Sequence, residues 1–162
     1  MNKKNFKLGD VFIIPFEGER PFFGLISAMS NHRKVKLLQV RIFDEDPLVL
    51  LGEKISIVVI KQHCVLTCIS NSFSLDEGRW KVLGEYPGWI QDEWFVEDFA
   101  FSTFNGQWFK SIYDRKLNKT MNSGISEVEA ARLPLDKILP DLALEEFLKR
   151  LPKRPGLHLV KS

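Results

Sequence analysis

The N-terminal third of the chain alternates between apolar runs and short polar breaks, a pattern typical of β-strands. Residues 10–16, 22–30 and 35–43 are rich in β-branched and aromatic side chains, and polar turns separate them. Pro15 lies inside the first run and cannot donate to a strand ladder, so it predicts a sheet edge or a bulge at that point. Three short strands joined by tight turns predict an antiparallel meander that could curl into a small barrel.

The middle of the chain predicts further strands after the break at 44–47. The largely apolar run 55–60 predicts a strand that is buried on both faces. Residues 65–70 and 79–84 predict two more strands, the second of them after a turn at 76–78.

A hairpin and a loop are predicted next. Strand-forming residues flank Asn105-Gly106, which predicts that 99–104 pairs with 107–113 through a two-residue turn, because both turn residues accept positive φ. The polar residues 116–124 predict a loop.

The last quarter of the chain changes to helical spacing. Ser126 and Glu129 fit a capping box ahead of a short helix, which Pro134 is expected to end. Pro140 predicts the first turn of a second helix, where its missing N–H costs nothing. One face of this second helix is apolar and predicts packing on the sheet. Its members are Leu144, Phe147, Leu148 and Leu151.

Together these elements predict an α+β fold, with a curled antiparallel β-sheet or small barrel-like sheet and C-terminal helices packed on it. We expect a single domain over 1–162, mainly β in 1–113 and helical in 125–151, with a tail at 152–162. In the turn before the first strand, the Asp10 carboxylate is expected to accept hydrogen bonds from backbone donors.

Composition excludes several classes of protein. The 162 residues are 44% hydrophobic and 27% charged, which is ordinary for a globular chain and excludes a disordered one. No apolar run approaches the roughly 20 residues of a membrane-spanning helix. No signal peptide is visible at the N-terminus, so we expect a cytoplasmic protein that does not engage a membrane.

The two cysteines predict free thiols. Cys64 and Cys68 are four positions apart, and in a strand that spacing separates them by roughly 13 Å, too far for a disulfide. A zinc site would need two more ligands, and His32 and His158 have no ligand spacing. We expect buried thiols and no metal.

The net charge of +2 conceals an uneven distribution. Residues 44–98 hold eleven Asp and Glu against four Lys and Arg, whereas residues 1–43 hold three against eight. An acidic surface in the middle of the chain would attract basic proteins and repel nucleic acid. Solvated loops and strand edges are the simpler explanation of the same charges.

The sequence lacks the motifs of the common catalytic sites. The chain has no glycine-rich phosphate loop, no nucleophile elbow and no paired-histidine zinc motif. His63 and Cys64 are neighbours, and on a strand their side chains would point to opposite faces. Carboxylate pairs are plentiful, but spacing alone does not place two of them across a cleft. We therefore expect no catalytic residue and no cofactor.

Residues 87–98, which we call the acidic segment, are the candidate partner-binding surface. Most aromatic residues of the chain predict core, but Trp89 and Trp94 lie in this irregular stretch, where a loop tip is expected. Exposed aromatic rings beside carboxylates are typical anchors for a protein partner. The candidate residues are Trp89, Asp92, Glu93, Trp94, Glu97 and Asp98.

The first two strands and a later one resemble a known family. Lys7–Phe16, with its Gly-Asp-Val-Phe-x-Ile-Pro order, and Phe22–Ile26, with its aromatic-Gly-apolar order, resemble the opening of the bacterial immunity protein 26 family. Trp80–Gly84, followed by Pro87, resembles a later strand of that family. The resemblance covers residues 7–88, and its motifs are strand patterns without specific chemistry.

The resemblance implies a function that composition does not reach. Such proteins bind and neutralise a cognate toxin of a polymorphic toxin system by occluding it, and they are not enzymes. Gly9, Asp10 and Pro15 would then determine the fold. An acidic surface would suit a basic nuclease toxin. The sequence assigns neither the toxin nor the oligomeric state.

A second resemblance implies a different class. Gly9-Asp10-Val11 and Arg20-Pro21 are similar to the PemK/MazF endoribonuclease toxins, which implies a catalytic role for Arg20. Two features depart from that family. The connection before Arg20 is short where the family has a longer substrate loop, and residues 35–43 contain no Ser or Thr to complete the site.

A third interpretation is a small-barrel module that binds nucleic acid through its basic N-terminal third. Lys34, Lys36 and Arg41 would carry that binding. The acidic middle region disfavours it.

Overall fold

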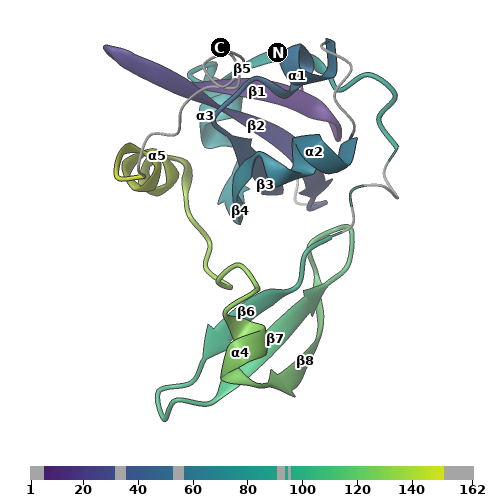
Figure 1. Ribbon diagram of the computed structural model, residues 1–162, viewed down its shortest axis with the longest axis vertical. Helices are drawn as coiled ribbons and strands as arrows, with labels where there is room; N and C mark the ends of the chain where they lie inside the picture. The colour runs from purple at the N-terminus through teal and green to yellow at the C-terminus, as the bar shows by residue number, and fades with distance from the viewer. Residues whose placement is uncertain (1–5, 32–35, 53–56, 91–93, 95, 152–162) are drawn as a thin grey trace.

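The protein is an α+β fold with two open antiparallel sheets (Figure 1). The computed structural model describes residues 6–31, 36–52, 57–90, 94 and 96–151. The larger sheet has the strand order β4-β3-β2-β1-β5, and the smaller has the order β6-β7-β8. The strands are Asp10–Phe16 (β1), Glu19–Met29 (β2), Leu37–Phe43 (β3), Cys64–Asn71 (β4), Lys81–Glu85 (β5), Phe99–Ser102 (β6), Trp108–Tyr113 (β7) and Lys119–Ile125 (β8).

The predicted N-terminal meander is confirmed, because β1, β2 and β3 are neighbours in the larger sheet. The sheet does not close into a barrel, since β4 and β5 lie at its two ends. Pro15 lies where the β1–β2 register shifts, so the predicted irregularity is a bulge inside the sheet. In the preceding turn the backbone N–H of Lys7 donates to the Asp10 carboxylate at 2.8 Å, as expected.

In the part of the chain that the structure describes, five short helices accompany the sheets. The prediction of a strand at 55–60 is wrong, because the described part of that run lies in α2. A short apolar run does not by itself distinguish a buried strand from a buried helical turn. The helices are Pro47–Gly52 (α1), Ile57–Gln62 (α2), Phe73–Glu77 (α3), Glu127–Ala130 (α4) and Asp141–Lys149 (α5).

The first face of the larger sheet packs against α3 and α5. Leu144 and Leu148 of α5 are buried in this cluster, as the helical spacing predicts, whereas Phe147 is 41% exposed. Trp80 stacks on Phe12 with ring centroids 5.4 Å apart. The other fully buried members include Ile14, Ile26, Leu38, Val40 and Ile42.

The second face of the same sheet carries a separate aromatic cluster. Alternate residues of β1, β2 and β3 point to this side, because successive side chains of a strand face opposite ways. The buried members are Val11, Leu25, Phe43, Ile60, Tyr86 and Trp94. The larger sheet is therefore covered on both faces.

The smaller sheet contains the predicted hairpin, with a different turn. The Gly106 N–H donates to the Thr103 carbonyl at 3.0 Å, and the Thr103 N–H donates to the Gln107 carbonyl at 2.8 Å. Gly106 has a φ of +86°, whereas Asn105 is not in the positive-φ region. The connection is thus a three-residue loop with a bulge at Gly106, and the predicted two-residue turn is wrong.

The predicted loop at 116–124 is also wrong, because most of it forms β8. Strand β8 pairs with β7 from Trp108↔Ile125 to Tyr113↔Lys119. Most side chains of β8 are exposed, so the strand does not need apolar residues at alternate positions. A polar strand at a sheet edge carries little sequence signal.

Residues 134–139, which we call the strap, connect the two sheets. The Ala100 N–H of β6 donates to the Pro134 carbonyl at 2.8 Å, and the Leu139 N–H donates to the Ile69 carbonyl of β4 at 2.8 Å. The same segment therefore covers one edge of each sheet.

Neither cysteine forms a disulfide. Cys68 is buried, and burial raises the pKa of its thiol to about 12. Cys64 is partly exposed. Across the described ranges, no helix is long and apolar enough to cross a membrane.

Candidate functional site

Trp89 and Trp94 of the acidic segment pack into the aromatic cluster on the second face of the larger sheet. Trp94 is 1% exposed, so the expectation of an exposed ring at that position is wrong. Its ring lies 5.7 Å from Tyr86 and 6.0 Å from Trp89. Trp89 is partly buried against Gly9, where an added Cβ would lie 2.6 Å from the indole. These aromatic rings anchor the segment, and little of Trp94 is left for a partner.

Glu97 also points inward. Its carboxylate accepts a hydrogen bond from Arg41 at 3.0 Å, and its backbone N–H donates to the Gln39 side-chain oxygen at 3.2 Å. Gln39 is fully buried and Arg41 is 7% exposed. Arg41 is therefore unavailable for nucleic acid, and the ion pair fixes the C-terminal end of the acidic segment to β3.

Of the two candidate carboxylates that the structure describes, Asp98 is the more exposed. Lys110 of β7 lies 3.9 Å from it and 3.8 Å from Glu129 of α4. This lysine links the end of the acidic segment to the smaller sheet and its helix. Asp92 and Glu93 lie outside the described residues.

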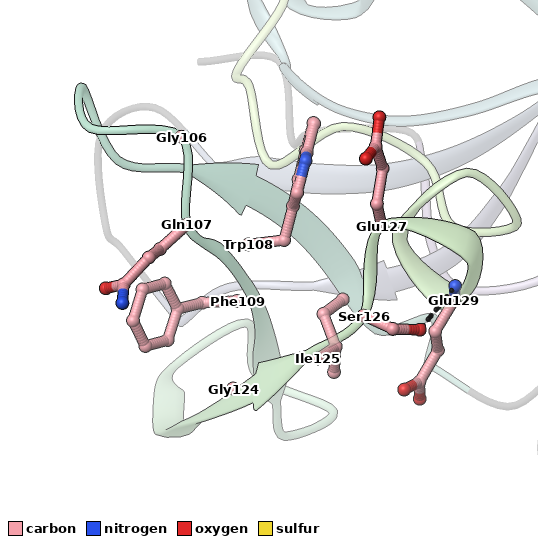
Figure 2. A pocket seen from close by; sticks show the side chains of 9 residues that line it. All are labelled: Gly106, Gln107, Trp108, Phe109, Gly124, Ile125, Ser126, Glu127 and Glu129. Carbon is pink, nitrogen blue, oxygen red and sulfur yellow. Dashed lines mark hydrogen bonds between the residues drawn. The ribbon is translucent and has the colours of Figure 1, made fainter.

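A solvent-open groove of about 620 Å³ lies beside α4 on the smaller sheet (Figure 2). The Trp108 indole and the Glu127 side chain project in the same direction along it, whereas the Glu129 carboxylate points the other way. Ser126 caps α4 by accepting from the Glu129 N–H at 3.1 Å, which confirms that half of the predicted capping box. The lining residues are Gly106, Gln107, Trp108, Phe109, Gly124, Ile125, Ser126, Glu127 and Glu129.

The groove suits a cationic side chain. The side chain of Glu127 forms no ion pair or hydrogen bond with any described residue, unlike that of Glu129, which faces Lys110. An aromatic face beside a free carboxylate attracts a guanidinium or ammonium group. Because the groove is open, it fits a side chain presented by a macromolecule better than a small molecule that must be enclosed.

A cluster of titratable side chains around Asp136 holds the strap on the smaller sheet. Asp136 of the strap accepts hydrogen bonds from Ser111 and Tyr113 and lies 3.2 Å from Lys119. Burial raises the pKa of Asp136, but these three donors outweigh it and hold the pKa below its ordinary value. Burial and the adjacent carboxylate raise the pKa of Tyr113. The cluster binds the strap to β7 and β8.

Arg20, the residue implied by the endoribonuclease resemblance, lies on the surface at the start of β2. Its guanidinium donates to the Asp44 carbonyl at 3.2 Å. Phe16 pairs with Glu19, so the β1–β2 connection is a tight turn. Lys34 lies outside the described residues, and Lys36 has its backbone N–H bonded to Ser72.

Within the described ranges, no three histidine, cysteine or carboxylate side chains gather closely enough to hold a metal ion. Comparisons of the chain with family models, with curated proteins and with solved structures gave no match.

The groove was not predicted from the sequence. Trp108 fits an ordinary strand pattern, and Glu127 is one of several acidic residues in a helical stretch. The capping box at Ser126 locates the start of α4, but nothing in the sequence says that α4 returns to β7. That contact depends on tertiary structure.

Proposed function

We propose that the chain is a non-catalytic immunity protein, which binds a cognate bacterial protein toxin in the cytoplasm and neutralises it by occlusion. The strand patterns at 7–88 motivate the proposal, and a basic nuclease is the toxin class that suits the charge of the middle region. Binding, rather than chemistry on a small substrate, is the activity that the open surfaces of the smaller sheet favour.

The observation that carries the proposal is the anchoring of Trp94 and Glu97, two described residues of the acidic segment. Trp94 is buried, and Arg41 donates a hydrogen bond to the Glu97 carboxylate at 3.0 Å. A surface that is ordered before binding loses little conformational entropy when a partner arrives. Asp98 and the carboxylates of α4 then present negative charge from a rigid support.

The buried scaffold is consistent with the roles that the resemblance implies. Gly24 lies against Phe12, where an added Cβ would be 2.1 Å from the ring, and Trp80 stacks on the same ring. The motif residues thus act in packing, while the partner surface lies elsewhere. This is what we expect of proteins that share one packed scaffold and bind different toxins through different surface residues.

Co-expression with the toxin domain encoded by the adjacent gene tests the proposal. We expect restored host growth and a complex that co-purifies. Failure to rescue, together with growth arrest or RNA cleavage caused by this protein alone, would contradict it and point to Arg20 instead.

Charge reversal then locates the surface. Asp98→Lys, combined with Asp92→Lys and Glu93→Lys, should slow association about tenfold at low salt. Glu97 is left intact because reversing it would place like charges beside Arg41. The matched control is Glu17→Lys, in the exposed β1–β2 turn of the other sheet, which should leave the rate unchanged. Equal rates for both variants would show that the acidic segment does not attract the toxin.

A further inference from the structure

Strand β8 is an open edge of the smaller sheet. The opposite edge, β6, is covered by the strap through the Ala100–Pro134 and Asp136–Ala100 backbone hydrogen bonds. On the outer side of β8, by contrast, no strand pairs with it in the part of the chain that the structure describes. An uncovered edge presents unpaired N–H and C=O groups to which an extended segment can add.

The groove lies at the C-terminal end of this edge. Gly124 and Ile125 of β8 line it together with Trp108, which is the cross-strand partner of Ile125. Glu127 follows two residues later and points along the groove beside the indole (Figure 2). An extended segment that paired with β8 could therefore place one of its side chains against Trp108 and Glu127.

The charged residues near the groove indicate that the inserted side chain is basic. Glu127 has no counter-ion among the described residues, and Asp98 and Glu129 share Lys110 close by. Lys119, at the other end of β8, is occupied by Asp136 at 3.2 Å. The groove end of the edge thus repels phosphate and attracts a cation, which favours a protein segment over nucleic acid.

We propose that β8 and the groove bind an extended, basic segment of a partner protein. The segment adds to the outer edge of β8 and inserts an arginine or lysine side chain between Trp108 and Glu127. This inference names the site and the partner segment for the proposed toxin binding, and in that respect it rests on the proposed function. The edge pairing itself does not require the toxin to be known.

A peptide titration tests the inference without the toxin. The isotope-labelled full chain is titrated with a short peptide of alternating valine and arginine, and backbone amide and indole N–H signals are followed by NMR. We expect saturable shifts of the β8 amides and of the Trp108 indole, with a Kd of about 1 mM or tighter. A peptide of alternating valine and glutamate should give no saturable shift.

Three variants keep the test specific. Glu127→Gln should weaken binding of the arginine peptide about threefold or more, whereas the matched variant Glu17→Gln should not change it. Trp108→Phe assigns the indole signal and keeps an aromatic face. Equal shifts with both peptides, or shifts that avoid β8 and Trp108, would overturn the inference.

The two proposals fail in distinguishable ways. If co-expression rescues growth while the arginine peptide does not bind at β8, the immunity function stands and the edge site is wrong. If the peptide binds at β8 but no complex with the toxin forms, the edge site stands and the immunity function is wrong.

Discussion

The two sheets of this protein are built in opposite ways. In β3, an inner strand of the larger sheet, six of seven residues are buried, whereas in β8 five of seven are exposed and none is buried. The larger sheet is covered on both faces by two hydrophobic clusters, and the smaller sheet leaves a groove and an edge open. Burial of apolar area stabilises the larger sheet, whereas the smaller sheet leaves backbone and side-chain groups exposed.

The largest expected loss of stability comes from Trp80, in the core of the larger sheet, and we compare it with Trp108 of the smaller sheet. Trp80 is 1% exposed, stacks on Phe12, and donates its indole N–H to Glu145 at 2.8 Å. Trp80→Ala should lower the free energy of unfolding by about 3–5 kcal/mol. Trp108→Ala, on the half-buried groove, should cost about 1 kcal/mol. Urea unfolding followed by circular dichroism measures both losses of stability. Equal losses would contradict the claim that the larger sheet is the more closely packed.

A glycine in each sheet gives a matched pair of smaller effects. Gly24→Ala would press a methyl group into the Phe12 ring 2.1 Å away and should cost about 3 kcal/mol. Gly124→Ala meets no atom within 4 Å and should change stability by less than about 1 kcal/mol. Thermal unfolding of the two variants is the measurement. A large loss from Gly124→Ala would show that the smaller sheet is as closely packed as the larger one.

The strap that joins the sheets should be sensitive to pH. The pKa of Asp136 is lower in the folded protein than its ordinary value of 3.8, so its charge stabilises the fold above that pH. This stabilisation is lost as pH falls through the lowered pKa. Asp136→Asn should cost about 2 kcal/mol at neutral pH and progressively less below about pH 4. A cost that stays constant in acid would show that the carboxylate charge is not what holds Ser111, Tyr113 and Lys119.

The smallest stability effect concerns the helix beside the groove. Ser126→Ala removes the cap of α4 and should cost about 1 kcal/mol. Because α4 is short, its fraying should also broaden the Trp108 indole signal, which NMR detects directly. Ser126→Asp, which restores an acceptor, should recover both the stability and the sharp signal.

Sequence patterns predicted the larger sheet better than the smaller one, for a physical reason. The strands of the meander bury one or both faces, so their apolar residues are required and visible. Strand β8 needs only backbone pairing with β7, and its polar residues suggested a loop. The run at 55–60 has the composition of either a strand or a helix, and its length did not decide between them.

The candidate surface was predicted only in part. The acidic segment was identified from its charges, but the burial of Trp94 and the pairing of Glu97 depend on Tyr86 and Arg41, which strand pairing and folding bring to the same face. The spacing of residues along the chain does not predict such tertiary contacts. The Trp108–Glu127 groove was missed for the same reason.

Hydrogen–deuterium exchange of the complex with the adjacent toxin domain tests most directly which sheet meets the partner. We predict slowed exchange in 96–98, in β8 and in α4, with little change in α3 and α5. Protection confined to α3, α5 and β5, with β8 exchanging as in the free protein, would contradict the assignment of recognition to the smaller sheet.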